Sequence, residues 1–180
     1  MKETLFEIVQ RPLNNLGSTN SSLIAFRDNA GVIRGFGTTM ILPETPGTPS
    51  EMKICDRQVH ITCTAETHNH PTFVAPFPGA QTGAGGRIRD NTAVGRGGIT
   101  GVGVAGYFVG NLFIPGYTIP GEVVGEDKPS KYASPLSILI EGSNGVSSYG
   151  NQFGEPLTLG FTRTFGQLVG SEWREPRKPI

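Results

Sequence analysis

The sequence predicts a fold that combines β-strands with α-helices, and three observations carry that prediction. Residues 58–66 alternate apolar and polar side chains, which is the two-residue period of a half-buried strand. Residues 23–27 and 32–36 have strand character and flank an Asp-Asn-Ala-Gly turn, so they predict a hairpin. Residues 143–152 and 157–165 are expected to be helical, with Pro156 between them.

The other segments complete the expected order of elements. A helix is expected over residues 5–10 and should end before Pro12. Residues 43–50, which contain three prolines, and the charged residues 120–135 predict surface loops. Apolar and aromatic residues predict strands over 107–114 and 136–140, the second short and buried. Residues 172–180 are expected to form a charged, proline-rich tail.

Composition excludes several classes of protein. The 180 residues include 15 basic and 15 acidic side chains, a balance that argues against a nucleic-acid protein held by a basic field. No run reaches the roughly 18 apolar residues that span a bilayer, and the first residues lack the apolar stretch of a secretory signal. Two cysteines are too few for a disulfide framework. We therefore expect a cytoplasmic protein that binds neither nucleic acid nor membrane.

Residues 66–71, Glu-Thr-His-Asn-His-Pro, are the densest group of side chains capable of chemistry. If the preceding strand continued, Glu66, His68 and His70 would point to one side, an arrangement that invites a zinc site. No fourth ligand stands at a familiar spacing, so two other readings are better supported. The group could act in catalysis or phosphate contact, or it could be two structural histidines near a strand end.

Glycine makes up 26 of the 180 residues, and residues 78–90 are a glycine-rich run that ends in Arg-Ile-Arg-Asp. Small residues would let successive backbone N–H groups approach a phosphate. Arg87 and Arg89 would add charged donors, and Asp90 has the carboxylate that Mg²⁺ prefers. The run predicts a phosphate-binding loop, with a flexible surface loop as the alternative.

Two further motifs have weaker signals. Residues 101–106 fit Gly-x-Gly-x-x-Gly, but the aromatic residues that follow favour a strand where a dinucleotide-binding fold needs a helix. We expect a strand or strand-flanking loop there and no dinucleotide. Residues 142–145 and 149–156 could present backbone N–H groups from a polar turn that opens a helix, or they could simply cap one.

Several of these motifs together resemble one family. Residues 64–72, 76–90 and 95–97 are similar to the synthetase domain of the phosphoribosylformylglycinamidine synthase family. Residues 110–117 and 149–156 resemble the large, single-chain form of that family, and residues 5–7 and 26–30 fit the same region. The resemblance covers nearly the whole chain in register.

The resemblance implies an α+β fold like that of aminoimidazole ribonucleotide synthetase, in which mixed-sheet strands contribute to a central barrel and helices flank them. Residues 1–135 would form the later part of the first synthetase domain. Residues 136–180 would begin the following α/β domain.

The resemblance also implies a reaction. Formylglycinamide ribonucleotide, ATP and ammonia from glutamine would combine in a magnesium-dependent step of purine biosynthesis. His68 would be the catalytic residue, and Thr67, Asn69, His70 and Arg89 would contact the substrate. Glu66 and Asp90 would hold Mg²⁺. The ATP phosphates would lie against Gly79, Ala80, Gln81, Thr82, Gly83, Ala84, Gly85, Gly86, Arg87, Ile88, Arg89 and Asp90.

Two features of the family's pattern are missing here. An upstream Ser-Glu-His run followed by Arg-His is absent, since His60 is the first histidine, and no glutaminase triad is present. We therefore expect a partial sequence whose partners are the remaining synthetase and glutaminase domains, inactive in isolation. A non-catalytic homologue that binds nucleotide or serves as a structural protein is the alternative. Another member of the superfamily is a third possibility, against which the run at residues 66–71 argues.

Overall fold

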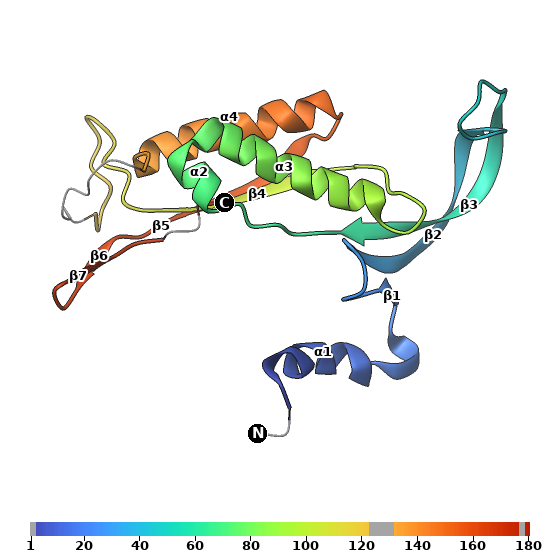
Figure 1. The fold of residues 1–180 in the computed structure, drawn as a ribbon, viewed down its shortest axis with the longest axis horizontal. Coiled ribbons are helices and arrows are strands. Elements are labelled where there is room, and N and C mark those ends of the chain that lie inside the picture. The colour runs from blue at the N-terminus through green and yellow to red at the C-terminus, as the bar shows by residue number, and fades with distance from the viewer. Residues whose placement is uncertain (1–2, 123–131, 177–178) are drawn as a thin grey trace. The chain divides into compact units, whose positions relative to one another are not determined.

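The computed structural model describes residues 3–122, 132–176 and 179–180, and it divides into two compact units, Met1–Cys63 and Thr64–Ile180. Most of the loop expected over residues 120–135, and part of the tail expected over 172–180, lie outside the described residues. Figure 1 shows the helices and strands of both units as a ribbon.

The first unit is a helix followed by an antiparallel sheet. Helix α1 (Leu5–Asn15) and the single 3₁₀ turn η1 (Gly17–Thr19) lead into strands in the order β1 (Ser22–Ile24), β2 (Gly31–Pro43) and β3 (Met52–Cys63). A capping box begins α1, because Thr4 accepts from the N–H of Glu7 and the Glu7 carboxylate accepts from the N–H of Thr4.

The predicted hairpin is confirmed, but its boundaries shift. Strand β1 ends at Ile24, and Phe26 follows with a φ of 57°, a left-handed conformation that a strand cannot contain. The predicted end of α1 before Pro12 is wrong, since the helix continues through that residue. The strand expected over residues 58–66 begins earlier, at Met52, and ends earlier, at Cys63.

The second unit packs two helices on one face of a parallel strand pair (Figure 1). After α2 (His70–Val74) come α3 (Pro76–Ala93), β4 (Gly103–Val109), α4 (Pro135–Gln152) and β5 (Leu157–Thr164), with the small hairpin β6 (Gln167–Val169) and β7 (Glu172–Arg174) at the end. Because β4 and β5 are parallel, the connection between them has to cross over, and α4 lies in that connection. The core gathers small and aromatic side chains of both layers: Ala80, Ala84, Ala105, Tyr107 and Val146.

Two elements were predicted with the wrong type. Residues 136–140 are not a strand but the first turns of α4, which Ser134 caps by accepting from the N–H of Ser137 at 3.2 Å. A short apolar run does not distinguish a buried strand from a buried helix, and the cap with Pro135 at the first position decides the outcome. Residues 157–165 are not helical, because Leu157–Thr164 forms β5, whose threonines and Phe161 suit a strand.

Other predictions are confirmed at the level that the structure tests. The helix over 143–152 is the second half of α4, and residues 103–106 begin β4. The fold is mixed α+β, and no closed barrel forms among the described residues. The likeness to aminoimidazole ribonucleotide synthetase and the domain boundary after residue 135 stay predictions. In the described ranges no helix is both long and apolar enough to cross a membrane.

The α3–α4 contact depends on Gly145, which generates a first prediction. A Cβ at Gly145 would overlap the carbonyl oxygen of Phe77, whereas a Cβ at Gly142 would meet its nearest atom, of Thr72, at 3.6 Å. In the full-length gene product, Gly145→Ala should cost about 1–3 kcal/mol of local stability by overpacking. Amide hydrogen exchange of α3 and α4 should then accelerate about 5- to 150-fold, as read by mass spectrometry.

Gly142→Ala is the matched control, since it makes the same substitution in the same helix without a clash. It should leave exchange unchanged or slow it, because alanine favours a helix by about 1 kcal/mol over glycine. Equal exchange rates in the two variants would contradict the packing argument.

Candidate functional site

The segment that contains His68 is extended chain between β3 and α2, and two backbone hydrogen bonds attach it to the sheet of the second unit. The N–H of His68 donates to the carbonyl of Ile180 at 3.1 Å, and the N–H of Phe108 donates to the carbonyl of Pro179 at 3.2 Å. Pro179 is fully buried and Ile180 packs on the core. Residues 179–180 therefore hold the His68 segment beside β4.

The His68 side chain lies directly against helix α3. A Cβ built on Gly83 would fall 2.6 Å from the Cβ of His68 and 2.9 Å from its Cγ. Nδ1 of His68 is buried and has no hydrogen-bond partner among the described residues. Because a buried polar atom without a partner is costly, His68 is a candidate for contact with a ligand or a water molecule.

Two other residues of this segment also have a buried side-chain oxygen without a hydrogen-bond partner within the described ranges. Oδ1 of Asn69 and Oγ1 of Thr72 are also buried without a partner in the described part of the chain, and Thr72 is fully buried. Nδ2 of Asn69 donates to Oγ1 of Thr67 at 3.4 Å, so the amide is oriented by its own segment. Among the described residues, three of the buried polar atoms without a partner therefore lie within residues 68–72.

Glu66 and His70 do not share a strand face with His68. Because β3 ends at Cys63, the alternation that would align Glu66, His68 and His70 does not occur. Glu66 is exposed, and His70 begins α2 with its ring edge-on to Tyr132 at 6.2 Å between centroids. No three metal-binding side chains gather in the ranges that the structure describes, so the zinc arrangement does not form.

The expected phosphate loop over residues 79–90 is wrong in its conformation, because these residues form the body of α3. Inside a helix each N–H donates to the carbonyl four residues before it, as the N–H of Gly79 does to Ala75 at 2.9 Å. A backbone anion nest is therefore unavailable over this run. Any phosphate contact has to come from side chains, and the phosphate-binding role of the run stays a prediction.

The glycines of α3 serve close packing. A Cβ at Gly79 would overlap the backbone of Pro71 and Thr72, and one at Gly85 would come within 2.8 Å of the Tyr149 ring. With Gly83 against His68, three glycines let the helix touch neighbouring chain directly. Gly86, in contrast, faces open space.

Arg87 and Arg89 occupy opposite environments. The Arg87 guanidinium donates through both terminal nitrogens to the Glu155 carboxylate, with Nη1 2.9 Å from Oε2. The Glu155 side chain is 1% exposed and that of Arg87 is 13% exposed, so this pair is buried. Arg89 is 76% exposed and contacts Asp90 at 3.0 Å. Arg89 is thus the arginine of α3 that remains available to a ligand in solution.

Helical spacing relates these side chains to His68. Asp90 is seven residues after Gly83, about two turns, so it lies on the same face of α3 roughly 10 Å further along. Asp90 is buried, whereas its neighbour Arg89 points into solvent. The convergence of Glu66, His68, Arg89 and Asp90 on one pocket stays a prediction.

Sequence analysis missed the partner of Arg87. Glu155 lies in the turn after α4. Its carboxylate packs against Gly103, so that a Cβ on Gly103 would overlap a carboxylate oxygen. The acid between Gly154 and Pro156, within residues 149–156, could have indicated an ion pair, but nothing in the local sequence indicated which basic residue it would contact. Residues 142–145, for which a turn opening a helix was considered, lie inside α4.

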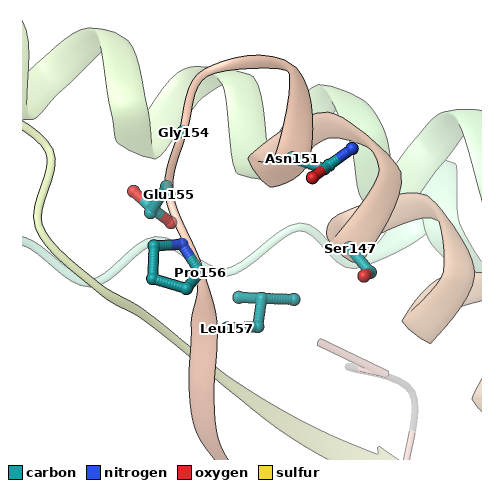
Figure 2. Close-up of a pocket in the computed structure, with 6 residues that line it drawn as sticks. All are labelled: Ser147, Asn151, Gly154, Glu155, Pro156 and Leu157. Atoms are coloured by element: carbon teal, nitrogen blue, oxygen red, sulfur yellow. The ribbon is translucent and has the colours of Figure 1, made fainter.

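A pocket of about 280 Å³ lies beside Glu155 (Figure 2). Its lining comes from the last turns of α4 and the start of β5, namely Ser147, Asn151, Gly154, Glu155, Pro156 and Leu157. None of the residues that the sequence predicts for catalysis or for phosphate, substrate or metal binding lines it.

Comparison with known proteins finds relatives over nearly the whole chain. The chain is 50% identical over 179 residues to "Phosphoribosylformylglycinamidine synthase" of Dictyostelium discoideum and 45% identical over 178 residues to the human protein of that name. It is 48% identical over 181 residues to a "Probable phosphoribosylformylglycinamidine synthase, chloroplastic/mitochondrial" of Arabidopsis thaliana. These alignments cover 98–100% of the chain but only 13% of each relative. No family model matches the chain.

The buried ion pair generates a second prediction. Glu155→Gln leaves the Arg87 charge buried without its counterion, which should cost about 3–5 kcal/mol. Amide exchange in α3 and in the turn after α4 should accelerate strongly in the full-length gene product. Glu172→Gln is the control, because it breaks an exposed pair with Arg174 worth about 1 kcal/mol or less. Similar effects of the two substitutions would refute the assignment of Arg87 and Glu155 as a structural pair.

Proposed function

This chain is homologous to one segment of the phosphoribosylformylglycinamidine synthases, and we propose that it contributes the synthetase chemistry of such an enzyme in purine biosynthesis. The proposed reaction is an ATP-dependent ligation. ATP phosphorylates the amide oxygen of formylglycinamide ribonucleotide, which releases ADP. Ammonia derived from glutamine then displaces the phosphate and leaves the amidine.

His68 is the proposed catalytic residue, acting on the substrate amide, and one observation carries that assignment. Its side chain lies against α3 and its backbone N–H is bonded to Ile180, yet its Nδ1 atom has no partner in the described part of the chain. A histidine held in place with an unpaired ring nitrogen can act as a general acid or base. Thr67, Asn69 and His70 adjoin it and are proposed to contact the substrate.

The ATP phosphates are proposed to lie near the exposed side chains of α3. Arg89 provides a solvent-accessible guanidinium, which suits phosphate or the substrate's own phosphate group. Arg87 is less suited to that role, because Glu155 already neutralises it.

Glu66 and Asp90 are the proposed magnesium ligands. Both provide hard carboxylate oxygens, and Mg²⁺ typically takes one or two carboxylates together with phosphate oxygens and water. The chemistry of this pair therefore suits such an ion without a third protein ligand. Bound Mg²⁺ would offset the charge of the phosphates.

The whole-protein context is also part of the proposal. We propose a cytoplasmic enzyme whose partners are the remaining synthetase and glutaminase domains, with no nucleic acid and no membrane. The plant relative is named chloroplastic/mitochondrial, so the compartment of this chain stays part of the proposal. The non-catalytic alternative has no support, since the relatives compared here are named as synthases.

A third prediction tests the role of His68. In the full-length gene product, His68→Ala should lower the ammonia-dependent rate by about 10²–10⁴, the typical share of a general acid–base group. Product formation from formylglycinamide ribonucleotide, ATP and ammonium chloride measures that rate without the glutaminase. Glutaminase activity should survive at some level, because its chemistry lies elsewhere.

His60→Ala is the control for this experiment, since His60 sits on β3 in the first unit and accepts from the N–H of Gly35. It should leave the ammonia-dependent rate nearly unchanged. If His68→Ala kept the rate within about threefold of wild type, under ~1 kcal/mol of barrier, His68 would not be catalytic.

A fourth prediction concerns residues 1–180 expressed alone. We expect no synthase turnover with ammonium chloride and poor stability. The outer face of β4 and β5 exposes Val104, Phe108, Leu159 and Phe161. The far edge of β5 pairs with no strand among the described residues, and an exposed apolar face next to such an edge favours aggregation. Light scattering and the amidine assay measure both properties. Turnover near that of a full-length synthase would contradict the prediction.

A further inference from the structure

His68 contacts helix α3 through the first atoms of its side chain, Cβ and Cγ, which lie against Gly83. A Cβ on Gly83 would lie 2.6 Å from the Cβ of His68, 2.9 Å from Cγ and 3.5 Å from Nδ1. Rotation about χ1 moves the ring but leaves the His68 Cβ where it is, so no rotamer of His68 relieves the overlap. Any side chain at position 83 must therefore displace the backbone of one partner.

The His68 backbone has little freedom to retreat. Its N–H is bonded to Ile180, whose neighbour Pro179 is bonded in turn to Phe108 of β4. Three and four residues further on, the chain packs against α3 again, because Gly79 lies against Pro71 and Thr72.

Helix α3 is also anchored. Ala80 and Ala84 are buried in the core with Tyr107 and Val146, and Arg87 is tied to Glu155 one turn beyond Gly83. A rigid helix and a fixed segment meet at a position where only a hydrogen atom fits. The position of the imidazole is thus determined by the absence of a side chain at residue 83.

We propose that Gly83 is a positioning residue for His68, which sets where the imidazole stands for the reaction. The inference rests on the proposed function, in which His68 acts on the substrate amide. Gly83 acts through His68 and needs no contact with substrate or phosphate. This role also accounts for a glycine at a helical position where alanine would favour the helix by about 1 kcal/mol.

The test is Gly83→Ala in the full-length gene product. We expect the ammonia-dependent kcat to fall about 10²-fold, the order of loss that a displacement of ~1 Å causes in a catalytic group. The KM for ATP should stay within about threefold, because the N–H groups of α3 are used within the helix and Gly83 has no side chain that could bind ATP. The exchange rate of the imidazole C2 hydrogen of His68, followed by mass spectrometry, should change at least about threefold. His60 in the same protein serves as the internal reference.

Two controls separate positioning from general destabilisation. Gly142→Ala adds a methyl group to the facing helix without a clash and should leave both kcat and the His68 exchange rate unchanged. Gly145→Ala disturbs the α3–α4 contact without meeting His68, so it should accelerate amide exchange more than Gly83→Ala does. A larger loss of kcat in Gly145→Ala than in Gly83→Ala would indicate a merely structural effect and overturn the proposal.

The outcomes also distinguish this inference from the proposed function. If His68→Ala abolishes the reaction but Gly83→Ala leaves kcat and the His68 exchange rate unchanged, the positioning role is wrong and the function stands. If Gly83→Ala shifts the exchange rate of His68 while His68→Ala has no effect on the rate, the contact is real but the catalytic role fails. A rise in KM for ATP at constant kcat would assign Gly83 to the nucleotide instead.

Discussion

The second unit depends on the direct approach of helix α3 to the chain around it. Gly79, Gly83 and Gly85 place bare backbone against Pro71 and Thr72, His68 and Tyr149 in turn. From the facing helix, Gly145 meets the carbonyl of Phe77 in the same way. Protein interiors tolerate neither voids nor overlaps of the size of a methyl group, so these contacts fix the position of α3 within the second unit. The motif before α2 and the side chains on α3 are positioned together as a consequence.

The same packing determines which arginine of α3 is buried and which is exposed. The turn after α4 brings Glu155 beneath α3, where it neutralises Arg87 inside the protein. Two residues later the helix has turned far enough to place Arg89 in solvent. Two arginines that look equivalent in the sequence thus have different functions open to them, one in holding helices together and one in binding an anion. Burial of both would leave the surface of α3 without a cation, and exposure of both would leave Glu155 unpaired.

The elements that sequence analysis predicted correctly are those with a strong local signal. The alternation of Val59, Ile61 and Cys63 predicted the strand that is β3, because a two-residue period is typical of a strand. The turn at residues 28–31 predicted the hairpin of β1 and β2. Its failures have two causes. The apolar run at 136–140 is compatible with strand and helix alike, and Ser134 with Pro135 settled the choice. At residues 79–90 each glycine opposes a helix by about 1 kcal/mol relative to alanine, and tertiary packing overrides that preference.

The sequence by itself determined which residues are available for chemistry: the histidines, acids and arginines of 66–90, their order, and their likeness to one enzyme family. It also determined the neutral charge and the absence of a long apolar run. Only the tertiary structure decided that Arg87 is consumed by Glu155, that Ile180 holds the backbone of His68, and that Gly83 is where the imidazole rests. The physical reason is that these partners lie 68, 112 and 15 residues apart, and contacts over such separations are selected by packing rather than by local conformational preference.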